Sequence, residues 1–144
     1  MKKILLSAAL AFACCTGAMA ASQKADADEA GVRQALNAYF QGHATGNGDH
    51  FRQAFYPEAK LLFVRDGKLT SWTSEEYASR SSGKPAPDED KRVRTVEMID
   101  ISGDAAIAKV VLDYPQVRFV DYMTLLKIDG TWRIINKSFH STRK

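Results

Sequence analysis

The segment from Tyr122 to His140, YMTLLKIDGTWRIINKSFH, decides the fold of this chain. Two runs rich in aliphatic, aromatic and β-branched residues flank the pair Asp129-Gly130. Asp-Gly between such runs is the strongest short-range signal for a β-hairpin, because a type I′ turn needs positive φ at both central positions. The segment therefore predicts a long β-hairpin, and we expect a functional site on its inner face.

More strands are predicted before this hairpin. After a polar loop over residues 81–90, strand candidates run over residues 92–101, 105–114, 117–128 and 131–139. Connections this short make neighbouring strands antiparallel. Earlier in the chain, two short runs flank Asp66-Gly67 and predict a second hairpin, with strands over residues 60–64 and 68–72.

The N-terminal part of the chain predicts helices. Apolar residues recur at helical spacing after Asp28, which predicts an amphipathic helix that ends near Gly42. Its apolar stripe consists of Val32, Ala35, Leu36, Tyr39 and Phe40. Helices followed by a meander of strands predict the α+β class, with the helices packed on one face of a curved, mainly antiparallel sheet.

Two shorter helices are predicted from their caps. Asp49 follows a glycine-rich break, and we expect it to be the N-cap of a helix that ends before Pro57. Thr73 and Glu76 have the spacing of a capping box, which predicts a helix over residues 74–80.

The first twenty residues predict a secretory signal peptide. Lys2 and Lys3 precede an apolar run over residues 4–13, and Ala18-Met19-Ala20 fits a cleavage site. We expect a flexible leader over residues 21–27 and a single domain over residues 28–144, in the periplasm or outside the cell. The apolar run is shorter than the roughly 20 residues of a membrane span, so no membrane insertion is expected after cleavage.

Composition limits the partners of the mature chain. Removing residues 1–20 from 144 leaves 124, which suits one domain with a core of its own. Both cysteines leave with the signal, so no disulfide is expected. The 18 basic residues that remain after the loss of Lys2 and Lys3 nearly balance the 17 acidic ones, so the charge does not indicate nucleic-acid binding.

The chain resembles the nuclear-transport-factor-2-like superfamily, and within it the SnoaL-like and lumazine-binding group. The resemblance lies in residues 32–59, VRQALNAYFQGHATGNGDHFRQAFYPEA, and in residues 128–135, IDGTWRII. It implies a cone of helices and strongly bent sheet around a pocket open at one end, commonly as a dimer through the outer sheet face. It does not imply one activity, because relatives include isomerases, dehydratases, cyclases and non-catalytic binders.

A regular hairpin places a candidate catalytic pair on its inner face. With a two-residue turn, Asp121 opposes Ser138 and lies diagonal to Asn136 and His140, with roughly 7–8 Å between Cα atoms. A carboxylate that orients a histidine in an apolar pocket suits proton transfer, so Asp121 and His140 are the candidate catalytic residues. The alternative is structural: His140 lies at a fraying strand end, and Asp121 pairs with a lysine. A one-residue bulge at the turn would also change this alignment.

The same alternation places Arg133 and Lys137 on the opposite face, which we expect to be the outside and a dimer surface. The predicted ligand contacts are two aromatic, two sulfur-containing and two polar side chains, all expected to line the pocket. They are Trp72, Tyr77, Met98, Met123, Asn136 and Ser138.

These residues lead to three hypotheses of function. The first is an exported, homodimeric protein that binds a small apolar or aromatic molecule in its pocket. The second is an isomerase- or dehydratase-type enzyme with His140 as general base and Asp121 orienting it. The third is a protein-interaction module that uses the outer face around Ile135 and Phe139. No metal or cofactor is predicted, because the three histidines lack metal-binding spacing and no phosphate-binding glycine loop is present.

Overall fold

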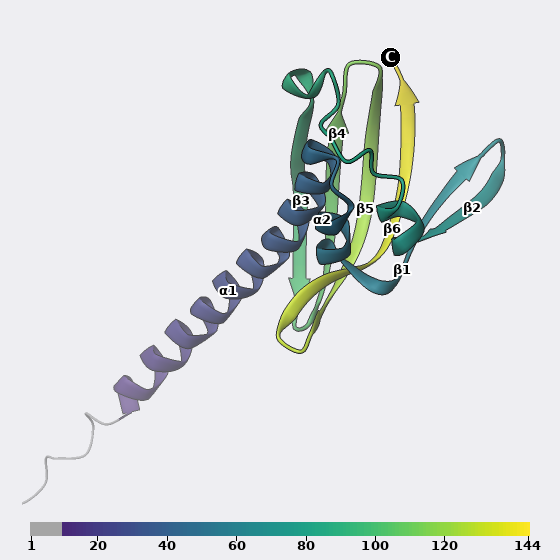
Figure 1. The fold of residues 1–144 in the computed structure, drawn as a ribbon. Coiled ribbons are helices and arrows are strands. Elements are labelled where there is room, and N and C mark those ends of the chain that lie inside the picture. Colours follow the sequence, from purple (N-terminus) through teal and green to yellow (C-terminus); the bar gives the residue numbers. More distant parts are fainter. Residues whose placement is uncertain (1–9) are drawn as a thin grey trace, which may run out of the picture.

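The computed structural model describes residues 10–144 and has the predicted α+β class (Figure 1). The helices are α1 (Leu10–Thr45), α2 (Gly48–Ala54) and α3 (Ser74–Ala78), with a 3-10 turn η1 (Glu89–Lys91). The strands are β1 (Phe55–Arg65), β2 (Lys68–Thr73), β3 (Val93–Ser102), β4 (Ala105–Asp113), β5 (Val117–Ile128) and β6 (Thr131–Arg143). Helices α1 and α2 lie across one face of the curved sheet.

All six strands form one sheet in the order β2-β1-β6-β5-β4-β3. Neighbours are antiparallel except β1 and β6, which are parallel although far apart in sequence. Both predicted Asp-Gly hairpins are confirmed. Asp129 and Gly130 have φ of 49° and 76°, and Asp66 and Gly67 have φ of 51° and 74°, as a type I′ turn requires.

Helix α1 is longer than the helix predicted after Asp28. It runs through residues 21–27, which were expected to form a flexible leader. This segment is exposed but contains three alanines, the residue with the highest helix propensity, so its helicity comes from local preference and not from burial. Cleavage after residue 20 stays a prediction. Among the described residues, no helix is long and apolar enough to cross a membrane.

A buried carboxylate fixes α1 to the β5–β6 hairpin. Asp28 is only 3% exposed. It accepts hydrogen bonds from Lys127 Nζ at 2.7 Å and from Trp132 Nε1 at 3.4 Å, and it pairs with Lys24 at 3.0 Å. The hydrogen bonds from Lys127 and Lys24 lower the pKa of Asp28 from 3.8 to about 2. Asp28 therefore stays ionised and holds the start of the domain against the hairpin.

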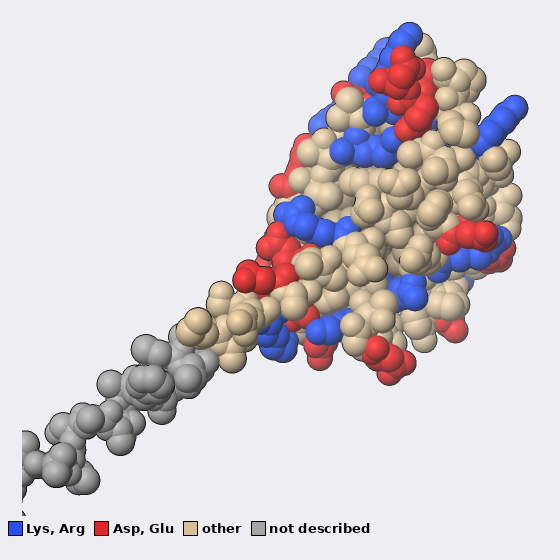
Figure 2. All heavy atoms as spheres, turned by 60° about the vertical axis from the view of Figure 1, so that its left-hand side comes forward, with Lys and Arg blue, Asp and Glu red and all other residues tan. Residues whose placement is uncertain are grey.

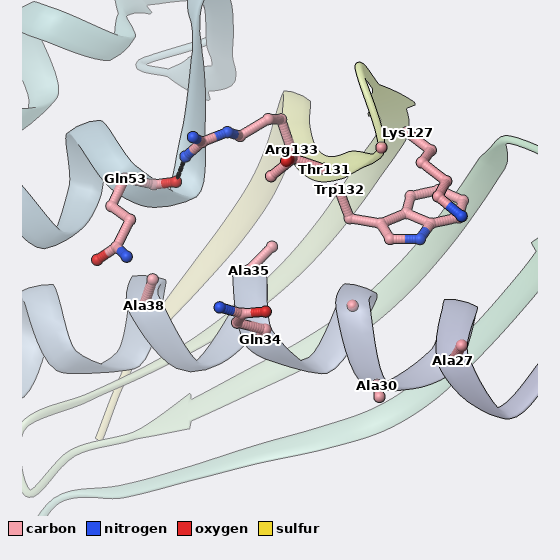
Figure 3. Close-up of a pocket in the computed structure, with 12 residues that line it drawn as sticks. Ala27, Ala30, Gln34, Ala35, Ala38, Gln53, Lys127, Thr131, Trp132 and Arg133 are labelled. Carbon is pink, nitrogen blue, oxygen red and sulfur yellow. Dashed lines mark hydrogen bonds between the residues drawn. The ribbon is translucent and has the colours of Figure 1, made fainter.

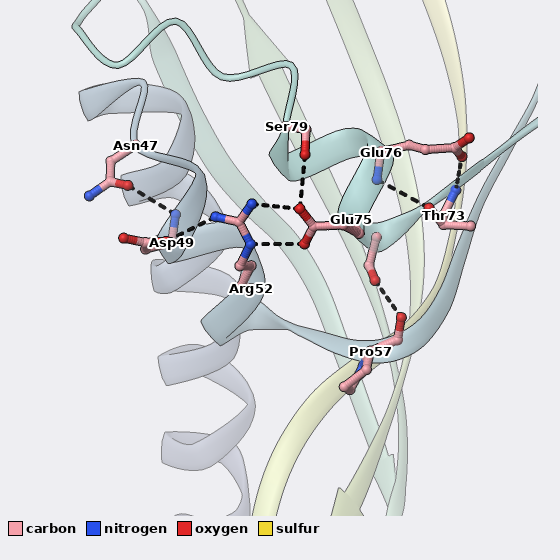
Figure 4. Close-up of polar contacts among 9 residues, drawn as sticks. Asn47, Asp49, Arg52, Pro57, Thr73, Glu75, Glu76 and Ser79 are labelled. Carbon is pink, nitrogen blue, oxygen red and sulfur yellow. Dashed lines mark hydrogen bonds and ion pairs between the residues drawn. The ribbon is translucent and has the colours of Figure 1, made fainter.

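Side-chain caps begin α2 and α3, and an ion pair joins the two helices (Figure 4). The prediction of Asp49 as N-cap is wrong: Asn47 is the N-cap, because its extended backbone lets its side chain accept from the Asp49 N–H at 2.9 Å. Thr73 caps α3 in the predicted capping box, although the helix ends at Ala78 and not at residue 80. Arg52 of α2 donates to both carboxylate oxygens of Glu75 in α3, at 2.8 and 2.6 Å.

A β-bulge changes the register of the long hairpin. Ile128 opposes Thr131 and Leu125 opposes Ile134, as predicted, but Thr124 opposes Asn136. Ile135 is therefore an extra residue in β6, and side chains after it point to the opposite face from the one predicted. The predicted alignment of Asp121 with Ser138 is wrong, because Asp121 opposes Phe139.

A second bulge lies in β3, between Val96 and Met98. It places Met98 on the outside, where its side chain is 40% exposed, so the prediction that Met98 lines the pocket is wrong. Bulges bend the strands that contain them. The two register shifts lie in β3 and in the β5–β6 pair.

The outer surface mixes both signs of charge. Figure 2 shows blue and red side chains interspersed around a broad tan area on the face that it presents. The outer sheet face also exposes large apolar side chains, among them Ile107 at 47% and Tyr122 at 54%.

Candidate functional site

Three polar side chains meet in the interior between α1, β5 and β6. Tyr39 Oη donates to Asp121 Oδ2 at 2.6 Å. Lys137 Nζ donates to Tyr39 Oη at 2.8 Å and to the same carboxylate oxygen at 3.1 Å. Asp121 and Lys137 are 0% and 2% exposed, and Tyr39 is fully buried. Such a buried ion pair is uncommon, because both charges lose their hydration.

Burial sets the titration of this cluster. It lowers the pKa of Lys137, and the negative charge of Asp121 opposes part of that shift. Burial also raises the pKa of Tyr39 well above its usual range, with the Asp121 charge as the next cause. The phenol therefore stays protonated and remains a hydrogen-bond donor, while the amine is less basic than a surface lysine.

Lys137 lines a cavity of about 530 Å³ whose walls are largely aromatic. Its Nζ lies 4.4 Å from the ring centre of Phe139, 5.1 Å from that of Tyr39 and 5.2 Å from that of Tyr77. The other lining residues are His43, Phe63, Val64, Arg65, Asp66, Trp72, Leu112, Phe119 and Ser141. The volume is in the range of small-molecule sites, and a few charged groups in a largely apolar lining are typical of them.

His43 and Tyr77 form a second polar pair in this cavity. Tyr77 Oη lies 2.9 Å from His43 Nε2. The His43 ring packs edge-on against Tyr39 and Phe51, with centroid distances of 4.8 and 5.0 Å. Burial, followed by the positive charge of Lys137, lowers the pKa of His43 well below its usual range. The imidazole is therefore neutral at physiological pH.

The structure brings together some of the predicted site residues. Trp72 and Tyr77 line the cavity as expected, while Met123 lies in the core, 2% exposed. The bulge at Ile135 sets Asn136 and Ser138 opposite Thr124 and Tyr122, on the outer face. Whether Trp72 and Tyr77 contact a ligand stays a prediction.

The predicted pair of Asp121 and His140 is not formed. His140 is exposed and opposes Val120, while Asp121 is buried and contacts Tyr39 and Lys137. The cause is again the extra residue Ile135, which turns His140 outward.

Sequence reasoning missed Lys137 and His43. Strict alternation placed Lys137 outside, and only the bulge brings it in. The predicted end of the first helix near Gly42 leaves His43 outside that helix, but α1 continues to Thr45. The signal that could have found it is spacing: His43 follows Tyr39 by four residues, so the two share a helix face.

A second hollow of about 580 Å³ lies between α1 and the start of β6 (Figure 3). Small side chains such as Ala27, Ala30 and Ala38 form its α1 side. Its two cations have partners, since Lys127 pairs with Asp28 and Arg133 donates to the Gln53 carbonyl. We place the candidate site in the aromatic cavity, because the buried side chain of Lys137 forms part of its wall. Within residues 10–144, no cluster of His, Cys, Asp and Glu side chains could hold a metal.

Residues 27–140 match the model of a protein family described as "Putative lumazine-binding". The chain belongs to this family. The match covers both helices and sheet, including Tyr39, Asp121 and Lys137.

Comparison with solved structures places this chain in the predicted nuclear-transport-factor-2-like superfamily. An NTF2-like protein of unknown function from Shewanella baltica is 26% identical, with a TM-score of 0.73 over 81% of this chain and 95% of that one. Another, from Methylobacillus flagellatus, is 30% identical, with a TM-score of 0.68 over 80% of this chain and 92% of that one. A curated relative named "Aldolase FrzH", from Cladobotryum sp, is 24% identical over 106 residues, 72% of this chain and 82% of the relative.

Proposed function

We propose that this protein binds a small, partly aromatic molecule in the aromatic cavity, with Lys137 facing its polar group. The observation that carries the proposal is a buried ammonium group at the wall of a cavity lined by aromatic rings. Lys137 is paired with Asp121, but a buried ion pair is often no more stable than apolar residues of the same volume, so its presence suits a role in recognition.

The family description supports a ligand of this class. Lumazine is a flat heteroaromatic compound with carbonyl groups, and flat rings stack well on Trp72, Tyr77 and Phe119. We take from the description the class of ligand and not its identity.

Replacing Trp72 by alanine is expected to weaken binding of a flat aromatic probe, 2-naphthalenemethanol. Trp72 lines the cavity and stacks at 6.2 Å from Tyr77, so its loss removes one wall. An aromatic pair contributes about 0.5–1.5 kcal/mol, which corresponds to a Kd about 2 to 10 times higher. Isothermal titration calorimetry measures this change.

The matched control is Tyr122→Ala, which removes an aromatic ring from the outer sheet face, where it is 54% exposed. Its Kd is expected to equal that of the unaltered protein. If Tyr122→Ala weakens binding and Trp72→Ala does not, the probe binds outside the cavity and the proposal is wrong.

We also propose that the protein is exported and acts as a homodimer. The support for export is the signal-like sequence of residues 1–20, and the support for a dimer is the exposed apolar area around Ile107 and Tyr122. Native mass spectrometry of protein recovered from the periplasm is expected to show a dimer of chains that begin at Ala21, with a bound small molecule. A full-length chain or a monomer would contradict this part.

A second candidate function is an enzyme. Two observations favour it: a carboxylate and an amine share one apolar pocket, and a 24%-identical relative is named an aldolase. The molecule recovered with the protein separates the two candidates. An enzyme converts it on incubation and loses this activity in the Asp121→Asn variant, whereas a binding protein leaves its mass unchanged.

A further inference from the structure

We propose that the Lys137 amine forms an imine with the carbonyl group of a small aromatic aldehyde or ketone held in the aromatic cavity. This inference rests on the proposed binding function and names the reacting group of the ligand. It assigns to Lys137 a covalent bond in addition to an electrostatic contact.

The position of the amine is the first argument. Lys137 lines the cavity, and its Nζ lies within 5.2 Å of the ring centres of Tyr77 and Phe139, which line the cavity with it, so a ligand bound there lies beside this side chain. Its side chain is 3% exposed, compared with 34% for Lys109 and 27% for Lys127. A lysine in such surroundings loses its proton more readily than a surface lysine, and the neutral amine is the nucleophile.

The second argument is a neighbour that can take the proton. Asp121 Oδ2 accepts hydrogen bonds from Tyr39 and Lys137. Asp121 Oδ1 is buried, and no hydrogen-bond partner for it exists among the described residues. The carboxylate can therefore accept the proton of the ammonium while Tyr39 still donates to it.

The chemistry balances within this cluster. The ammonium passes one proton to Asp121, and the Nζ lone pair then attacks the carbonyl carbon. The C–N bond forms, the π electrons of the carbonyl move to its oxygen, and a proton moves from nitrogen to that oxygen to give a carbinolamine. Asp121 returns its proton to the hydroxyl, which leaves as water, and the nitrogen lone pair completes the iminium. No oxidant or reductant takes part.

Charge is conserved at the site, which is the third argument. The ammonium and the iminium both carry one positive charge next to Asp121. The buried carboxylate therefore keeps a cation beside it before and after the reaction, so the product does not leave an unpaired charge in the interior.

The test uses 2-naphthaldehyde with sodium cyanoborohydride at pH 7. The reagent reduces an iminium to a stable secondary amine, which adds the mass of the aldehyde less one oxygen atom. Peptide mapping by mass spectrometry is expected to find this addition at Lys137 at least about tenfold faster than at Lys109, because binding makes the reaction intramolecular.

Lys137→Arg is the first control, since arginine keeps a cation beside Asp121 but does not form the imine. It is expected to lose the fast labelling, whereas Lys109→Arg keeps it. Circular dichroism of Lys137→Arg shows whether it folds. If it does not fold, the rate at Lys137 relative to Lys109 within the unaltered protein decides the question.

Binding of 2-naphthalenemethanol, which has no carbonyl group, separates the two proposals. If the alcohol binds in the cavity and the aldehyde labels lysines only in proportion to their exposure, the imine proposal is wrong and the binding function stands. If the alcohol does not bind and Lys137 is not labelled, both are wrong. Fast labelling of Lys137 supports both.

Discussion

Replacing Lys137 by methionine is expected to lower the free energy of unfolding by about 3–5 kcal/mol. Methionine keeps most of the side-chain volume but removes the charge, so Asp121 is left as an uncompensated carboxylate at 0% exposure. The hydrogen bond from Tyr39 at 2.6 Å remains but does not replace a cation. Urea denaturation followed by circular dichroism measures the loss.

The double variant Lys137→Met with Asp121→Asn tests the cause. Because it removes both charges, it is expected to recover most of the stability that Lys137→Met loses. An amide at residue 121 still accepts the hydrogen bond from Tyr39. If Lys137→Met alone costs less than about 1 kcal/mol, a value usual for exposed pairs, the cluster is not held as a buried ion pair.

Replacing Gly46 by alanine is expected to cost about 2–4 kcal/mol, from strain and overpacking together. Gly46 follows the end of α1 with φ of 68°, where a Cβ is strained. A Cβ would also meet the backbone carbonyl of Lys84, which cannot move aside like a flexible side chain. The Gly46 carbonyl accepts from the Gly83 N–H at 2.8 Å, so the change also loosens the loop after α3. Thermal or urea unfolding measures the loss.

Gly83→Ala is the matched control, because Gly83 has φ of 74° but no atom within 4 Å of an added Cβ. It is expected to cost only the strain, roughly 1–2 kcal/mol. Equal losses in the two variants would show that the contact between Gly46 and Lys84 does not matter for stability.

Local sequence signals predicted most of the fold. The two Asp-Gly turns and the capping box at Thr73 depend on a few adjacent residues, so the chain itself specifies them. The start of α1 was less predictable, because residues 21–27 are exposed and have no apolar stripe. The N-cap was placed two residues late, because Asn47 and Asp49 are both good caps and only the backbone conformation distinguishes them.

The site was less predictable than the fold. Trp72, Tyr77 and Asp121 face inward as predicted, because none of them lies in β6, the strand whose bulge changes the faces. Lys137 and His140 were assigned to the wrong faces because a bulge has no reliable local signature in a strand of β-branched and polar residues. The contacts of Tyr39 with β5 and β6 depend on packing between distant segments, which one sequence does not specify.

The extra residue at Ile135 also affects how members of this family are compared. Lys137 reaches the cavity seven positions after Gly130, and a relative without the extra residue presents its equivalent side chain six positions after the turn. Because an inserted or deleted residue of this kind lies inside a strand, an alignment that allows gaps only in loops pairs Lys137 with a residue that points away from the cavity. Relatives with a lysine at the same inward position are therefore found by superposing their strands on β5 and β6. The equivalent of Lys137 is then identified by the β5 residue that it pairs with.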